Sequence, residues 1–130
     1  MKIADPWKQI ITEQFLKTTI RTPSRFSLPP SSQRFLLEQM CRAFPLNKSI
    51  RIRPLRLAGL RAEELKPETE ATQLILHIHG GAFFLGSMNT HRAFVSDLAA
   101  STQMQVIHLD YPLSPEHPYP EAIDALFDVY

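Results

Sequence analysis

Residues 77–87 read His77-Ile78-His79-Gly80-Gly81-Ala82-Phe83-Phe84-Leu85-Gly86-Ser87, and they hold three of the four glycines of this 130-residue chain. The apolar run Leu74-Ile75-Leu76 stands directly before this stretch. An apolar run that ends in adjacent glycines is typical of a buried strand leading into a loop. Because glycine has no Cβ, the backbone of such a loop can approach a bound molecule closely. We therefore predict a fully buried strand over Gln73–His79 and a binding loop after it.

The composition is that of an ordinary globular protein. Apolar residues make up 44% of the chain and charged residues 21%, and the net charge of +1 gives no reason to expect nucleic acid as a partner. No apolar run reaches membrane-spanning length, and the first residues lack the apolar core of a signal peptide. Cys41 is the only cysteine, so no internal disulfide can form. We predict a cytoplasmic protein without a membrane anchor, in which Cys41 is a packed thiol.

Two helices are predicted in the first third of the chain. Asp5-Pro6 is a good helix start, and Trp7, Ile11 and Phe15 follow at helical spacing. Ser31 or Ser32 can cap a second helix that ends near Phe44, before Pro45. The apolar side of this second helix would consist of Phe35, Leu36, Gln39, Met40 and Ala43.

From Ile50 the pattern changes to short strands. Ile50–Leu57 and Leu60–Leu65 flank the turn Ala58-Gly59, which predicts an antiparallel hairpin with Pro54 on an edge strand. The polar segment Lys66–Thr72 is predicted as a loop.

A strand, a helix and a second strand follow in order. After the glycine loop, Asn89 or Thr90 can cap a helix that reaches about Thr102. Its inward side would be Phe94, Leu98 and Ala99, and Val106–Leu109 reads as a short buried strand. This order predicts a βαβ unit with two parallel strands.

The next segment is rich in proline and reads Asp110-Tyr111-Pro112-Leu113-Ser114-Pro115-Glu116-His117-Pro118-Tyr119-Pro120. Its prolines favour an extended loop that brings Pro120 to the first turn of a last helix. In that helix, the residues expected to share one face are Ala122, Ile123, Leu126, Phe127 and Tyr130.

Two of these segments resemble motifs of the hormone-sensitive-lipase-like branch of the α/β-hydrolases. The glycine loop resembles the motif His-Gly-Gly-Gly/Ala-Phe, and the proline-rich segment resembles Asp-Tyr-Arg-Leu-Ala-Pro-Glu-His-Pro-Phe-Pro. The resemblance implies an α/β fold that is the N-terminal part of an α/β-hydrolase. Residues 1–48 would form a helical lid or cap segment, although packing of these helices onto a core remains the alternative. Residues 49–130 would form a partial core with a hairpin and a βαβ unit.

The resemblance also implies functional roles. The N–H groups of Gly80, Gly81 and Ala82 would form the oxyanion hole of a carboxylic-ester hydrolase, which acts on a small-molecule ester and needs no cofactor. His79 would brace this loop, and Asp110 and Glu116 would support it as structural acids. Pro112 stands where the family has an arginine, which removes a cationic partner for these acids.

The residues for serine catalysis are incomplete. The chain has no Gly-x-Ser-x-Gly run, and Ser87, Ser96 and Ser114 have no flanking glycine elbow. We therefore expect the catalytic triad beyond Tyr130 and no catalytic residue in this chain.

The histidines do not form a metal-binding motif in the sequence. His77 and His79 would point to one face of a strand, which suits a metal pair. No Asp, Glu or Cys with ligand spacing accompanies them, so no metal site is predicted. His91 and His108 read as ordinary helix and strand residues.

Three hypotheses about function remain. The chain could belong to a working esterase that is completed by a following or separate polypeptide, or it could be an inactive truncated product. It could also be a binding module for small molecules that keeps the fold without catalysis. In the isolated chain the apolar strand Gln73–His79 would lie at an open sheet edge, which favours self-association.

Overall fold

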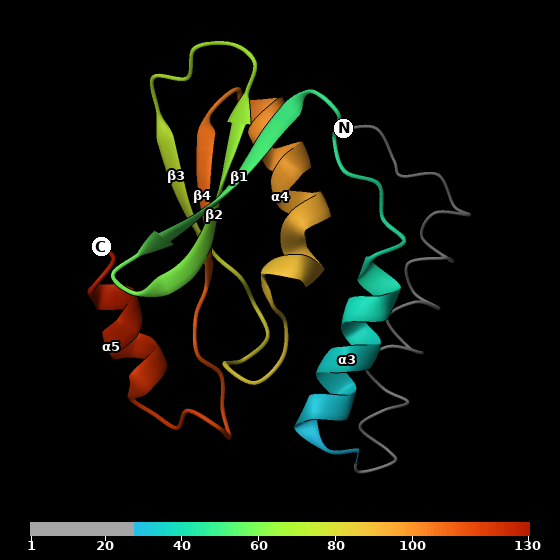
Figure 1. Cartoon of the computed structure of the whole chain (residues 1–130), viewed down its shortest axis with the longest axis vertical. Helices are drawn as coiled ribbons and strands as arrows, with labels where there is room; N and C mark the ends of the chain where they lie inside the picture. The colour runs from blue at the N-terminus through green and yellow to red at the C-terminus, as the bar shows by residue number, and fades with distance from the viewer. Residues whose placement is uncertain (1–27) are drawn as a thin grey trace, which may run out of the picture.

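The computed structural model describes residues 28–130, which form a four-stranded mixed sheet with helices on both faces (Figure 1). The helix predicted from Asp5 lies outside the described residues. In chain order, the elements are α3 (Pro30–Cys41), β1 (Ile50–Leu57), β2 (Leu60–Pro67), β3 (Leu74–Ile78), α4 (Met88–Thr102), β4 (Gln105–Asp110) and α5 (Glu121–Phe127).

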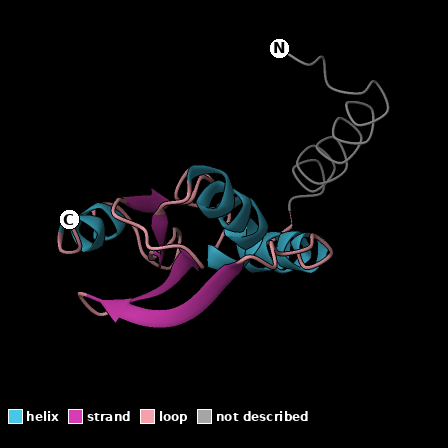
Figure 2. Ribbon diagram, turned by 90° about the horizontal axis from the view of Figure 1, so that it is seen from above, coloured by secondary structure: helices cyan, strands magenta, loops and turns pink. Residues whose placement is uncertain are grey.

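The first two strands form the predicted antiparallel hairpin. Ala58 and Gly59 connect them with φ values of 45° and 84°, as a two-residue turn between twisted strands requires. Figure 2 shows the strong curvature of this hairpin. Pro54 lies on the edge strand β1, as predicted. Strand β2 runs two residues further than predicted, to Pro67, and this proline is tolerated because pairing of β2 with β4 already ends at Leu65.

Strands β3 and β4 are parallel neighbours joined by α4, which confirms the predicted βαβ unit. Their register runs from Leu74 beside Gln105 to Ile78 beside Leu109. The strand order β1-β2-β4-β3 leaves β3 at an edge of the described sheet. Leu74 is 60% exposed and Ile78 46% exposed, so the expectation of a fully buried strand is wrong for this strand. The reason is that β3 has only one neighbouring strand among the described residues.

The side chains of β4 alternate between two cores. Val106 packs with residues of α4 on one face, and Ile107 and Leu109 pack toward α5 on the other. The first core consists of Ile50, Leu65, Val95, Ala99 and Val106, and the second is built on Ala62, Ile107 and Leu109, with Leu126 and Val129 against them.

Helix α4 begins two or three residues before the predicted start, because its cap is Ser87 and not Asn89 or Thr90. The Ser87 hydroxyl accepts from the Thr90 N–H, and the Thr90 hydroxyl accepts from the Ser87 N–H. This reciprocal capping box pairs two N–H groups that the helix itself leaves without an acceptor. Val95 and Ala99 are fully buried, whereas Phe94 is 59% exposed. The prediction of an inward Phe94 is therefore wrong, and its ring instead lies beside His77 near the open edge of β3.

Helices α3 and α5 leave several apolar side chains in solvent. The sequence predicted Phe35 and Leu36 on the apolar side of α3, but both side chains are exposed. The helix ends at Cys41, because the N–H groups of Ala43 and Phe44 bond to carbonyls three residues earlier, as in a 3₁₀ turn. In α5, Ala122 is buried and Leu126 packs on the sheet. Phe127 and Tyr130 were predicted on that face and are exposed instead. None of the helices between residues 28 and 130 is long and apolar enough to cross a membrane.

Candidate functional site

The candidate site is the glycine loop that leaves the carboxyl end of β3. It lies beyond the same end of the sheet as the proline-rich loop after β4 (Figure 1). Ligands of open α/β sheets bind at this end of the strands. The loop turns on the Gly81 carbonyl, which accepts from the N–H of Phe84 at 3.0 Å and from the N–H of Leu85 at 2.8 Å.

Two glycines are required by this turn. Gly81 has a φ of 131°, and a Cβ there would lie 1.9 Å from the Leu85 carbonyl oxygen. Gly86 has a φ of 86°, and its Cβ would lie 2.5 Å from the Gly80 carbonyl oxygen. By contrast, a Cβ on Gly80 would meet nothing within 4 Å. The steric need for glycine therefore lies at Gly81 and Gly86.

The middle of the loop is strained. Ala82 and Phe83 have φ values of 54° and 57°, a region that residues with a Cβ seldom adopt and that costs about 1–3 kcal/mol for each. The loop carbonyls are held from outside, since Ser114 N–H donates to Phe83 at 2.8 Å and Arg34 Nε donates to Phe84 at 2.8 Å.

Three consecutive backbone donors of the loop are unpaired. Gly80, Gly81 and Ala82 are exposed, and their N–H groups have no acceptor among the described residues. The arrangement can therefore bind an oxygen atom that carries negative charge.

His79 fixes the start of the loop. Its side chain is buried, with an exposed fraction of 2%, and its ring stacks on Tyr111 with 4.3 Å between ring centroids. The Tyr111 hydroxyl donates to the His79 carbonyl at 2.7 Å, and Nδ1 of His79 lies 3.0 Å from the Gly80 carbonyl. Sequence analysis did not single out Tyr111, although the residue stands inside the proline-rich motif.

Four imidazoles gather on the α4 face of the sheet, below this loop. The ring of His77 lies 4.7 Å from that of His108 and 6.2 Å from that of His91, and the rings of His79 and His91 are 5.4 Å apart. From the sequence, His91 and His108 were predicted to be ordinary helix and strand residues, and this cluster was not predicted. In the part of the chain that the structure describes, no group of three or more His, Cys, Asp or Glu side chains is arranged to hold a metal ion.

Burial and nearby imidazoles lower the pKa of three of these rings, those of His77, His79 and His91. Burial, followed by the fields of His108, His91 and His79, lowers the pKa of His77 to about 4. Burial also lowers the pKa of His79 and of His91 below the ordinary value.

The one buried carboxylate near the cluster is Glu63, which is 3% exposed. Arg92 Nε donates to its two oxygens at 3.0 and 2.8 Å, and His108 Nδ1 lies 3.4 Å away. Burial alone would raise the pKa of the Glu63 carboxyl, but the contacts with His108 and Arg92 lower it overall. Glu63 is therefore a paired anion.

Both predicted loop acids have cationic partners. Asp110 accepts from the Met88 N–H at 3.2 Å and lies 3.6 Å from a guanidinium nitrogen of Arg61. Glu116 forms an ion pair with Arg34 at 2.9 Å. Although Pro112 cannot supply a cation to these acids, arginines from α3 and β2 do so.

The serines that sequence analysis examined are engaged in structural contacts. Ser87 donates to Glu38 at 2.7 Å, Ser96 is fully buried and donates to the Ala93 carbonyl, and Ser114 donates to the His117 carbonyl. None of the three hydroxyls contacts an imidazole ring as a nucleophile requires. Burial and the nearby Glu38 raise the pKa of the Cys41 thiol, so this thiol is not activated either.

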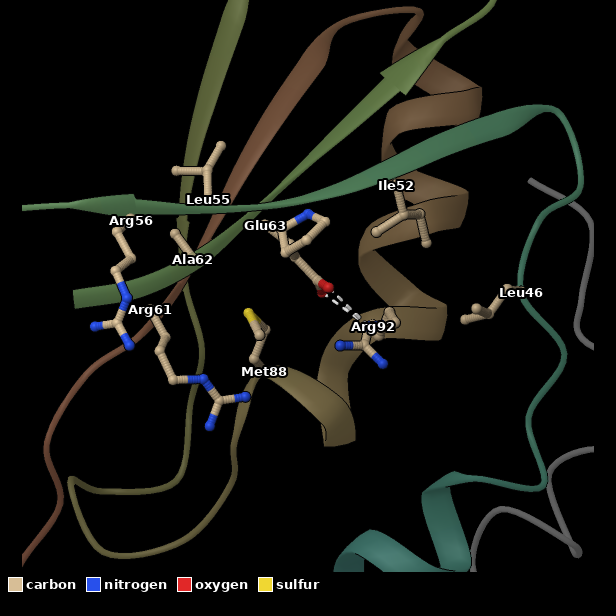
Figure 3. A pocket seen from close by; sticks show the side chains of 10 residues that line it. Leu46, Ile52, Leu55, Arg56, Arg61, Ala62, Glu63, Met88 and Arg92 are labelled. Carbon is tan, nitrogen blue, oxygen red and sulfur yellow. Dashed lines mark hydrogen bonds and ion pairs between the residues drawn. The ribbon is translucent and has the colours of Figure 1, made fainter.

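A large cavity lies away from the glycine loop. It measures about 740 Å³ and opens between the hairpin and the start of α4 (Figure 3). Arg92 and Glu63 form their ion pair inside it. The remaining lining residues are Leu46, Ile52, Pro54, Leu55, Arg56, Arg61, Ala62 and Met88. No residue of the glycine loop lines this cavity, so its size does not mark the site where the backbone donors gather.

This fold and loop are those of a known class. Residues 75–130 match a protein family that is described as having an alpha/beta hydrolase fold. Solved structures of such proteins superimpose on nearly the whole chain, so the chain forms the N-terminal part of an α/β-hydrolase fold.

Similar proteins are esterases. Over 130 residues the chain is 65% identical to a protein named "Esterase" from Acinetobacter venetianus, and it spans 43% of that protein's length. A solved esterase/lipase from an uncultured bacterium superimposes with a TM-score of 0.83 at 30% identity, over 98% of this chain and 42% of its own. A solved esterase of the bacterial hormone-sensitive lipase family superimposes with a TM-score of 0.75 at 31% identity, over 90% of this chain and 40% of its own. The resemblance seen in the sequence is thus confirmed, and the chain spans less than half the length of these relatives.

The turn at Gly81 can be tested with a matched pair of substitutions. Gly81→Ala should destabilise the chain by about 1–3 kcal/mol and accelerate hydrogen exchange at Phe84 and Leu85, because the new methyl group displaces the Leu85 carbonyl. Gly80→Ala has room for the methyl group and should change stability by less than about 0.5 kcal/mol. Urea unfolding and amide exchange measure both effects. Equal effects of the two substitutions would show that the described turn is not present.

The imidazole cluster predicts loss of stability in acid. Because the folded-state pKa values of His77, His79 and His91 lie below the ordinary value of 6.5, the unfolded chain binds protons first. Stability should therefore be full above about pH 6.5 and fall as the pH decreases toward 4. The lowered pKa of Glu63 acts in the same direction at still lower pH.

His77→Phe should reduce this acid sensitivity, because it removes one titrating ring and keeps an aromatic side chain beside Phe94. His117→Gln, at an exposed residue of the proline-rich loop, is the control and should leave the pH dependence unchanged. Urea unfolding at pH 7.5 and pH 5.0 measures the difference. The hypothesis fails if His77→Phe loses as much stability between pH 7.5 and pH 5.0 as the unmodified chain and the control variant do.

Proposed function

We propose that the chain is the N-terminal part of a serine carboxylic-ester hydrolase and that its glycine loop supplies the oxyanion hole. The donors are the N–H groups of Gly80, Gly81 and Ala82. The observation that carries the proposal is the absence of an acceptor for these three exposed groups among the described residues, at the end of the sheet where ligands bind.

The chemistry of ester hydrolysis requires such donors. Negative charge develops on the carbonyl oxygen when a nucleophile attacks, and fixed N–H groups that face it lower the barrier. A strained loop that is held from several sides suits this role, because its donors need no reorganisation during the reaction. The similarity to esterases over the whole chain supports the same reaction class.

The other site residues have supporting roles in this proposal. His79, Asp110 and Glu116 hold the loop, through Tyr111, the start of α4 and Arg34 respectively. We expect the nucleophile, base and orienting acid to lie in the part of the esterase length that this chain does not span. The substrate is a small ester, acyl transfer of this kind needs no cofactor, and the lone thiol of Cys41 favours a cytoplasmic location.

The proposal is tested by complementation. The chain alone should not hydrolyse p-nitrophenyl butyrate or react with a fluorophosphonate probe, because loss of a triad lowers kcat by about 10⁶-fold. Adding the C-terminal part of the Acinetobacter venetianus esterase as a separate polypeptide should restore hydrolysis. With Gly81→Ala in this chain, kcat of the pair should fall by about 10²–10³-fold, since one misplaced oxyanion donor has that effect.

Two results would contradict the proposal. One is labelling of a serine in this chain by the probe without the added polypeptide. The other is a complemented enzyme whose kcat is the same with Gly81 and with alanine at that position.

The open edge of β3 predicts self-association of the chain. Apolar side chains and unpaired backbone groups along β3 favour pairing with another strand. Ile78→Lys should shift the chain toward monomer, because it places a charge on that edge. Leu36→Lys is the matched control, since Leu36 on α3 is 44% exposed and Ile78 46%. Light scattering after size-exclusion chromatography gives the mass, and a monomeric unmodified chain would refute this prediction.

A further inference from the structure

One side chain of the cap segment reaches three points on the two loops of the site. The guanidinium of Arg34, from α3, donates through Nε to the Phe84 carbonyl at 2.8 Å and through another nitrogen to the Ser114 carbonyl. A third donor forms the ion pair with Glu116 at 2.9 Å. These acceptors lie 50, 80 and 82 residues further along the chain than Arg34. Three acceptors in different directions match the planar fork of arginine and exceed what a lysine can reach.

A second residue of α3 holds the far end of the same loop. Glu38 lies one turn after Arg34 on the same face of the helix, and its carboxylate accepts from the Ser87 hydroxyl at 2.7 Å. It also accepts from the Asn89 amide at 3.4 Å. Ser87 is the cap of α4, so α3 contacts both the middle of the glycine loop and the point where the loop becomes a helix.

The residues that Arg34 holds adjoin the strained part of the loop. Ala82 and Phe83 have positive φ values, and such backbone persists only where neighbouring contacts determine it. Arg34 fixes the Phe84 carbonyl immediately after them. Ser114 N–H fixes the Phe83 carbonyl, and Arg34 in turn holds the carbonyl of Ser114. Rotation of any of these peptide groups would reorient the N–H groups of the turn.

From these contacts we propose that Arg34 is a positioning residue for the glycine loop. It transmits the docking of the cap helix α3 to the backbone that carries the Gly80, Gly81 and Ala82 donors. Docking of α3 and order in the loop are then one coupled state. The role of these donors as an oxyanion hole rests on the proposed function. The coupling between docking of α3 and order in the loop rests only on the contacts described above.

Hydrogen exchange of the full chain, followed by mass spectrometry, tests the coupling without any catalysis. Arg34→Lys keeps the charge and the helix propensity but cannot reach all three acceptors. It should accelerate exchange in residues 80–87 about tenfold, which corresponds to the loss of hydrogen bonds to a charged group. Arg42→Lys is the matched control at the C-cap of the same helix, because among the described residues the side chain of Arg42 bonds only to Gln39, and it should leave this segment unchanged.

Glu116→Gln separates positioning from charge pairing. It removes the ion pair and leaves both carbonyl contacts of Arg34, so exchange in residues 80–87 should change much less than in Arg34→Lys.

Three outcomes would overturn the inference: exchange that rises in α3 alone, exchange that rises equally throughout the chain, or an effect of Glu116→Gln as large as that of Arg34→Lys. Because exchange reports loop order directly, failure of the complementation experiment would leave this result decisive.

Discussion

The carbonyl of Gly81 is the constraint on which the site depends. It accepts two N–H groups from residues three and four positions later, and this tight turn leaves no space for a Cβ at Gly81. Within this turn Ala82 and Phe83 adopt left-handed backbone, and Gly80, Gly81 and Ala82 are exposed. Contacts from α3, from Tyr111 and from Ser114 keep a conformation that an isolated loop of this sequence would not hold.

The sheet carries this loop on a polar layer as well as on an apolar core. On the α4 face, apolar packing of Val95 and Val106 gives way toward the loop to His77, His108 and the Glu63–Arg92 pair. Buried ionisable groups need partners, and each new proton in this layer meets other imidazoles nearby. Because burial lowers the pKa of His77, we expect the support of the loop to weaken as the pH falls below neutral.

The fold could be predicted where the sequence carries local signals. The apolar runs, the Ala58-Gly59 turn and the adjacent glycines were sufficient for the hairpin and for the βαβ unit. Predictions failed where the outcome depends on distant segments. The exposure of Phe94 and Phe127 follows from what covers the sheet, and helical spacing does not report this. The role of Arg34 could not be predicted from the sequence, because an arginine on an amphipathic helix normally faces solvent. Its partners also lie at least 50 residues further along the chain.

The two edges of the sheet differ in a way that limits assembly. Strand β1 carries Pro54 together with Arg51, Arg53 and Arg56, and proline and positive charge disfavour the addition of a strand. Strand β3 has neither. Two copies that join through β3 would leave a β1 strand at each end of the combined sheet, and both ends would resist further growth. If the chain associates through this edge, we expect association to stop at a closed pair.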